Sequence, residues 1–335
     1  MSKSGIFGQD AKQNFIILVI NNKAFMLMVL MFIVASFTTP AFLTRLNLLT
    51  VMRQISVAAI VSIGYTIIFS AGTFDMSIGD GIGLCAILYA LMSRIIPLPL
   101  AIIGAIAVGI TCGFINGSLI RIFNLPAFVS TLAVSMIFRG ITYMMTNGAT
   151  VFGLSDSVNV IGQGSLVHIP VPFLIMLGVL VIMFTVLNKT IYGRHVIATG
   201  GNPEAAKVSG IQVSIIRVSV FMVCGVCTAI GAIVLTGRLG AATPNMGVDF
   251  GLDAIAAVVI GGTSMRGGKA KVVGTVWGVV LVAIIGNMLA LMGVSPYFQW
   301  VVKGAIIVIA IILDNQTDAI LNKQREKATL KAAVK

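Results

Sequence analysis

The residues that could do chemistry are few, and their spacing excludes most enzymatic sites. The sequence holds ten Asp and Glu residues and two histidines. Neither His168 nor His195 belongs to an H-E-x-x-H zinc motif or to a Ser/His/Asp arrangement. Cys224 and Cys227 have the redox spacing C-x-x-C, but they lie in an apolar run without a nearby histidine or carboxylate, which favours helix packing. We expect no catalytic residues, no metal site and no cofactor.

One glycine-rich segment partly matches a nucleotide-binding loop. A P-loop reads G-x-x-x-x-G-K followed by Ser or Thr, because the hydroxyl group holds magnesium. In the segment that starts at Gly262, an additional glycine, Gly268, precedes Lys269, and Ala270 replaces the hydroxyl residue. We interpret the segment as a tight basic turn between two helices, not as an ATP site.

A carboxylate inside an apolar stretch is the first candidate for a binding function. Asp75 lies between Gly72 and Gly79, and a charge near lipid is costly unless it faces a cavity or a partner. The glycines indicate a broken helix, whose free backbone groups could hold a polar cargo together with Asp75, Ser77 and Asn116. In the alternative interpretation, Asp75 caps the helix that begins at Ser77.

Three further charged residues each have more than one interpretation. Arg139 lies inside an apolar run, where it lines the same polar path, forms a salt bridge, or extends to the outer membrane interface. Asp253 most simply caps a short helix. Alternatively, Asp249 and Asp253 lie in an outer loop and contact a soluble partner.

A polar segment further along predicts a short helix with a defined start and end. Asn202 is a suitable N-cap, Pro203 fits the first turn, and Glu204 complements the helix dipole. Gly210 ends the helix, which should therefore run from about 203 to 209. An ordinary surface helix is the alternative to a functional one.

These residues lie in a chain whose solvent must be largely lipid. Hydrophobic residues make up 58% of the sequence and charged residues only 10%, whereas soluble domains carry roughly 25% charged residues. A spanning helix needs about 20 apolar residues. The sequence predicts an all-α polytopic membrane protein with about ten spans, some short or broken, at 24–40, 54–72, 77–93, 98–120, 126–146, 170–187, 217–236, 253–264, 272–292 and 299–314.

The basic residues predict the orientation of this bundle. With both termini in the cytoplasm, sixteen of the 22 Lys and Arg residues lie on the cytoplasmic side, against four outside, namely Arg45, Arg53, Arg94 and Arg238. This positive-inside bias explains the net charge of +12 better than nucleic-acid binding does. We expect a cytoplasmic segment 1–23, a transmembrane domain 24–314 with a cytoplasmic loop at 188–216, and a charged cytoplasmic tail 315–335.

Glycine spacing predicts where helices approach closely. Gly109, Gly113 and Gly117 recur every four residues and share one helix face, and Gly274 and Gly278 repeat the pattern. We expect these positions to pack helix against helix, and we assign them no chemistry.

Several motifs together resemble the permease subunits of ribose-type ABC sugar importers. Glu204-Ala205-Ala206, followed after three residues by Gly210, resembles the "EAA" coupling loop of ABC importer permeases. Four stretches are similar to the ribose, xylose and galactoside branch, and they follow the order of that family: 74–79, 138–148, 198–211 and 252–264. The pattern departs from the family at Thr73, Phe74 and Asp80, so the resemblance indicates a sugar permease without specifying ribose.

The resemblance implies a bacterial inner-membrane homodimer with a translocation path along its axis. It implies an ABC ATPase with two nucleotide-binding domains docked on the coupling residues, and a sugar-binding protein on the outer face. The coupling residues are Asn202, Pro203, Glu204, Ala205, Ala206 and Gly210. The proposed path residues are Asp75, Ser77, Asn116 and Arg139, and the proposed docking residues are Asp249 and Asp253.

Two rival functions remain open at this stage. A permease of the same fold could carry another small polar solute, such as an amino acid, a nucleoside or a sugar-like signal molecule. An ion-coupled secondary transporter would need an intramembrane relay, for which only Asp75 and Arg139 are available.

Overall fold

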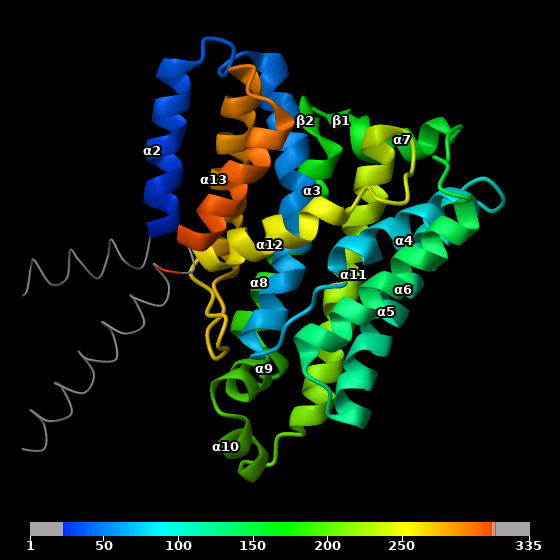
Figure 1. Cartoon of the computed structure of the whole chain (residues 1–335), viewed down its shortest axis with the longest axis vertical. Helices are drawn as coiled ribbons and strands as arrows, with labels where there is room; N and C mark the ends of the chain where they lie inside the picture. The colour runs from blue at the N-terminus through cyan, green and yellow to red at the C-terminus, as the bar shows by residue number, and fades with distance from the viewer. Residues whose placement is uncertain (1–22, 310–311, 313–335) are drawn as a thin grey trace, which may run out of the picture.

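The computed structural model describes residues 23–309 and 312, and it is mostly helical (Figure 1). Each of the ten segments predicted to span the membrane contains a helix. These helices are α2 (Lys23–Thr38), α3 (Arg45–Ser70), α4 (Ile78–Met92), α5 (Leu98–Phe123), α6 (Ala127–Thr146), α8 (Val171–Lys189), α11 (Val213–Leu239), α12 (Val248–Ile260), α13 (Val272–Leu291) and an unlabelled helix, Pro296–Ile309.

Six of the described helices are long and apolar enough to cross a membrane: α3, α5, α6, α8, α11 and α13. The remaining crossings and the side on which each terminus lies stay predictions. The expected cytoplasmic tail 315–335, and the expected N-terminal segment up to residue 22, lie outside the described residues.

Helices α3 and α11 form the centre of the core. More than half of the residues in the most apolar stretch of each helix are buried. Helix α11 packs against α3, α4 and α5. The predicted glycine face of α5 makes its contact with α11: a Cβ atom at Gly113 would overlap the Phe221 carbonyl oxygen, and one at Gly117 would lie 2.7 Å from the Val218 Cα. The two backbones therefore approach as closely as the glycine spacing predicted.

Helix α12 is short and packs against α13, α3 and α4. The second predicted glycine pair forms this contact, since Cβ atoms at Gly274 and Gly278 would overlap the carbonyl oxygens of Gly261 and Ala257. The C-terminal half of α12 is buried from Ala254 to Ile260.

The interpretation of Asp253 as a helix cap is wrong. Helix α12 begins at Val248, so Asp249 lies in its first turn and Asp253 inside it, and neither occupies a loop. Gly247, the residue before the helix, packs against the start of α4, since a Cβ atom there would overlap the Gly79 carbonyl oxygen and lie 2.6 Å from the Ile82 Cβ.

The two long loops carry structure of their own. The predicted outer loop contains α7 (Asp156–Gln163) and a hairpin of β1 (Ser165–Leu166) with antiparallel β2 (Ile169–Pro170), so the chain is not purely helical. The predicted cytoplasmic loop contains α9 (Ile191–Gly201) and α10 (Pro203–Val208). Figure 1 shows α7 and the hairpin at one end of the molecule and α9 and α10 at the opposite end, as the predicted topology requires.

Candidate functional site

The break between α3 and α4 brings together three of the predicted path residues. Ser77 donates hydrogen bonds from its backbone nitrogen (2.8 Å) and its hydroxyl group (2.7 Å) to Asp75 Oδ1. Asn116 of α5 donates from Nδ2 to Ser77 Oγ at 2.6 Å. All three side chains are buried, and Asn116 Oδ1 has no hydrogen-bond partner among the described residues.

The expectation that the break leaves backbone groups free for a cargo is wrong for the backbone nitrogens of its central residues. The backbone nitrogen of Asp75 donates to the Tyr65 hydroxyl group at 3.4 Å, and that of Met76 donates to Thr131 Oγ1 at 2.9 Å. The Ser77 nitrogen is taken by Asp75, as the capping interpretation anticipated. A polar solute at the break therefore finds no free backbone donor at these three residues.

Arg139 forms the salt bridge that was one of its alternatives. Its Nε lies 2.8 Å from Asp80 Oδ1, its Nη2 donates to Asp80 Oδ2 at 3.1 Å, and Ser135 also donates to Oδ2. Asp80 is buried, whereas 51% of the Arg139 side chain is exposed. Sequence reasoning noted Asp80 only as a departure from a family pattern, although an intramembrane cation calls for a nearby anion.

Two cavities meet at this polar cluster. Asp75 and Arg139 line a cavity of about 180 Å³, which Val248, Gly251 and Leu252 of α12 close on one side. Asp75 also borders a far smaller void of about 10 Å³, lined by Ser77 and Asn116. The structure thus places all four predicted path residues around one centre, but only Asp75 and Arg139 face a space larger than a water molecule.

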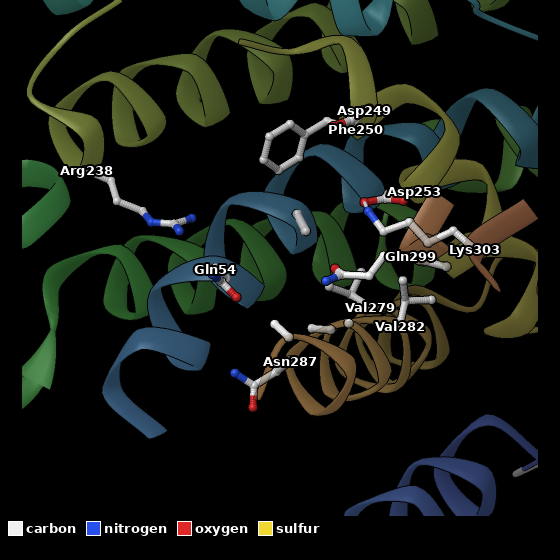
Figure 2. A pocket seen from close by; sticks show the side chains of 15 residues that line it. Gln54, Arg238, Asp249, Phe250, Asp253, Val279, Val282, Asn287, Gln299 and Lys303 are labelled. Carbon is white, nitrogen blue, oxygen red and sulfur yellow. Dashed lines mark hydrogen bonds and ion pairs between the residues drawn. The ribbon is translucent and has the colours of Figure 1, made fainter. Parts of the chain in front are cut away.

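The other face of α12 lines a larger cavity of about 340 Å³, drawn in Figure 2. Asp249 and Asp253 both border it, and Asp253 Oδ2 is 2.8 Å from the Lys303 ammonium group. Docking of a soluble partner by these two carboxylates stays a prediction.

The short predicted helix is present as α10, with the expected caps. The Asn202 side chain accepts a hydrogen bond from the Ala205 nitrogen at 3.0 Å. At the other end Gly210 has φ +85°, and the nitrogens of Gly210 and Ile211 donate to the carbonyl groups of Lys207 and Ala206, which is a Schellman motif. A residue with a Cβ atom is strained at this φ.

Helix α10 follows directly after a backbone junction. Gly268 donates from its nitrogen to the Ser70 carbonyl oxygen at 3.1 Å. A Cβ atom at Gly267 would lie 2.5 Å from the Gly200 carbonyl oxygen. A Cβ atom at Gly200 would overlap the Ser70 carbonyl oxygen. The end of α9, the end of α3 and the turn after α12 therefore meet main chain to main chain, and the glycine-rich turn has a packing role.

The chain is similar to known proteins over most of its length. Residues 47–311 match the family described as "Branched-chain amino acid transport system / permease component". The chain is 38% identical over 291 residues to the ribose import permease protein RbsC of Bacillus subtilis, covering 86% of this chain and 90% of that protein. It is 36% identical over 301 residues to RbsC of Haemophilus influenzae, covering 88% and 93%.

A permease named for a different sugar is similarly related. The galactose/methyl galactoside import permease protein MglC of Haemophilus influenzae is 34% identical over 330 residues, covering 91% of this chain and 97% of that protein. No solved structure matches the chain. The family match and these relatives span most of the sequence, so the chain belongs to this family of transport-system permeases and is a multi-pass inner-membrane transport subunit rather than an enzyme.

Proposed function

We propose that the chain forms the membrane path for a neutral monosaccharide in an ATP-driven importer. The observation that carries the proposal is the similarity, over at least 86% of the chain, to permeases named for ribose and for galactose. Asp75 and Arg139, which line the cavity of about 180 Å³, support it, because hydroxyl-rich solutes need side chains that accept and side chains that donate hydrogen bonds.

We further propose that α10 docks onto a partner ATPase, which supplies the free energy. Glu204 is exposed and Val208, one helical turn later on the same face, is 89% exposed. An exposed valine next to a carboxylate at the end of the molecule suits a protein interface. A sugar-binding protein would then deliver its cargo at the opposite end, and two copies of the chain would enclose the path.

The proposal retains the ten-span topology and the domain limits. A transmembrane domain 24–314 would lie between cytoplasmic segments 1–23 and 315–335, with α9 and α10 inside the cell. The sixteen-to-four distribution of basic residues supports this orientation.

The test is uptake of labelled sugars by cells or vesicles that contain the complete complex. We expect uptake of a monosaccharide such as D-ribose or D-galactose to stop when ATP is depleted and to survive an uncoupler. Uptake that resists ATP depletion but collapses with the uncoupler would establish an ion-coupled carrier instead. Uptake of amino acids but of neither sugar would support the rival solute class.

A further inference from the structure

The cavity of about 340 Å³ lies on the face of α12 that points away from the Asp75 cluster. Gln54 and Ala58 of α3 border it, as do residues of α13 and the helix Pro296–Ile309. Asp249, Phe250 and Asp253 border it from α12, whereas Val248 and Leu252 face the smaller cavity. The two cavities are thus separate sites on opposite faces of one short helix.

One ion pair is built into the wall of this cavity. Lys303 Nζ lies 2.8 Å from Asp253 Oδ2, and the side chains are 29% and 24% exposed. Burial on this scale is tolerated because each charge has its counter-charge. Figure 2 shows the two side chains next to each other, with Gln299 beside them and Gln54 across the same space.

Several other polar groups of the wall keep hydrogen-bonding capacity. Gln299 donates from Nε2 to the Val294 carbonyl oxygen at 3.0 Å, which leaves its Oε1 available. Within the described part of the chain, the side chains of Gln54, Arg238 and Asp249 form no hydrogen bond. These donors and acceptors border the cavity, where a ligand can satisfy them.

The charges of the wall favour an uncharged ligand. Asp249 and Asp253 match Arg238 and Lys303 in number, so these four groups give the wall no net formal charge. Carboxylates, amides and cations together offer both acceptors and donors, which matches hydroxyl groups that donate and accept at once. The ring of Phe250 adds an apolar surface for the C–H face of a sugar.

The volume of the cavity suits one sugar unit. Sites for small molecules span roughly 300–1,000 Å³, and this cavity lies at the lower end of that range. We propose that the cavity binds a neutral monosaccharide at a station separate from the Asp75 cluster, with Gln54, Asp249 and Gln299 as hydrogen-bonding residues. The sugar class rests on the proposed function, whereas the location rests on the cavity alone.

The test measures sugar binding to the full chain in lipid nanodiscs by saturation-transfer NMR, with D-ribose and D-galactose as probes. We expect Asp249→Asn to weaken binding about tenfold and Gln299→Ala about fivefold, because a hydrogen bond to a charged group is stronger than one to a neutral group. Gln54→Ala should weaken sugar binding by about the same factor as Gln299→Ala. Phe250→Leu, which keeps an apolar side chain, should weaken binding without unfolding the protein.

The matched control is Gln212→Ala, which removes an exposed amide at the start of α11. Arg238 lies near the other end of this 27-residue helix, so Gln212 is roughly 40 Å from the cavity by the helical rise, and binding should not change.

Two results would overturn the inference. Binding that ignores the cavity variants but is lost in Asn116→Ala would place the sugar at the Asp75 cluster alone. Absence of binding in a chain whose complete complex still imports sugar would also refute the station while leaving the proposed function intact. If the complex imports neither sugar and the chain binds neither, the proposed function fails as well.

Discussion

The Asp75 carboxylate carries two tasks with two oxygen atoms. Oδ1 holds the Ser77 nitrogen and hydroxyl group and so fixes the start of α4, while the carboxylate as a whole borders the cavity toward Arg139. An amide oxygen can replace Oδ1 in the first task, but an amide nitrogen cannot accept a hydrogen bond in place of Oδ2. The two tasks can therefore be separated by one substitution.

We predict that Asp75→Asn lowers the initial rate of sugar uptake about tenfold or more, because it removes a charged acceptor from the path. Thermal unfolding of the purified protein should change little, since the contacts to Ser77 persist. If the uptake kinetics of Asp75→Asn are unchanged, Asp75 has only a structural role.

The Arg139–Asp80 pair makes a stability prediction. Arg139→Met should destabilise the protein by about 3 kcal/mol, because Asp80 is then left buried with only Ser135 as a hydrogen-bond donor. Adding Asp80→Asn removes the unpaired charge, so the double variant should regain much of the loss. Thermal unfolding in detergent measures both, and a double variant no more stable than Arg139→Met would contradict the argument.

Among single residues, the sequence predicted which polar residues cluster, but it did not predict which charged residues form ion pairs. Asp75, Ser77 and Asn116 came together because each is a polar residue in an otherwise apolar run. Asp80 was missed as the partner of Arg139, since the two are far apart in sequence and no spacing rule connects them. Sequence reasoning also did not pair Asp253 with Lys303, for the same reason.

At the scale of whole elements, glycine faces fix the distance between helices. We predict that Gly113→Ala destabilises the protein by about 1–3 kcal/mol, because the added methyl group overlaps the Phe221 carbonyl oxygen and the backbones must separate. The control is Gly178→Ala in α8, where no atom lies within 4 Å of the added Cβ atom. That variant should be neutral or gain up to about 1 kcal/mol from helix propensity.

Helix α10 provides a test of coupling. Glu204→Ala should lower sugar uptake while the ATPase activity of the complex continues, because an exposed contact to the partner is lost but the caps of the helix remain. Gly210→Ala should have the same effect through strain at φ +85°. Normal coupling in both variants would remove α10 from the interface.

The matched control for Glu204 is Asp156→Ala, which removes a first-turn carboxylate from α7 at the opposite end of the molecule. Membrane insertion should be normal in all three variants, as measured by their amount in the membrane fraction. If Asp156→Ala uncouples transport to the same degree, the effect is not specific to α10.

Caps made α10 predictable, whereas other elements lacked such signals. Asn202, Pro203 and Gly210 define both ends locally, so α10 follows from sequence alone. Helix α3 begins at Arg45, nine residues before the predicted span, because a search for apolar residues rejects a helical turn that carries arginine. Helix α9 was missed, and its N-cap Thr190 is followed by a mixed polar and glycine-containing sequence with weak periodicity.

The orientation of the whole molecule can be tested by labelling with a membrane-impermeant maleimide. The native cysteines are all buried, so background labelling should be low. Val208→Cys in α10 and Val167→Cys in the hairpin place thiols at sites that are 89% and 83% exposed. We expect Val167→Cys to react in intact cells and Val208→Cys only in inside-out vesicles, and the reverse pattern would invert the topology.

The junction of Gly200, Gly267 and Ser70 has a mechanical consequence. Side chains change rotamer and can absorb a small displacement, but main-chain atoms in direct contact cannot. A displacement of α10 is therefore expected to displace the end of α3 and the turn after α12 by a similar distance. Helix α12 lies between the cavity of about 340 Å³ and the cavity of about 180 Å³. A displacement of α12 would therefore reduce the volume of one cavity and enlarge the other.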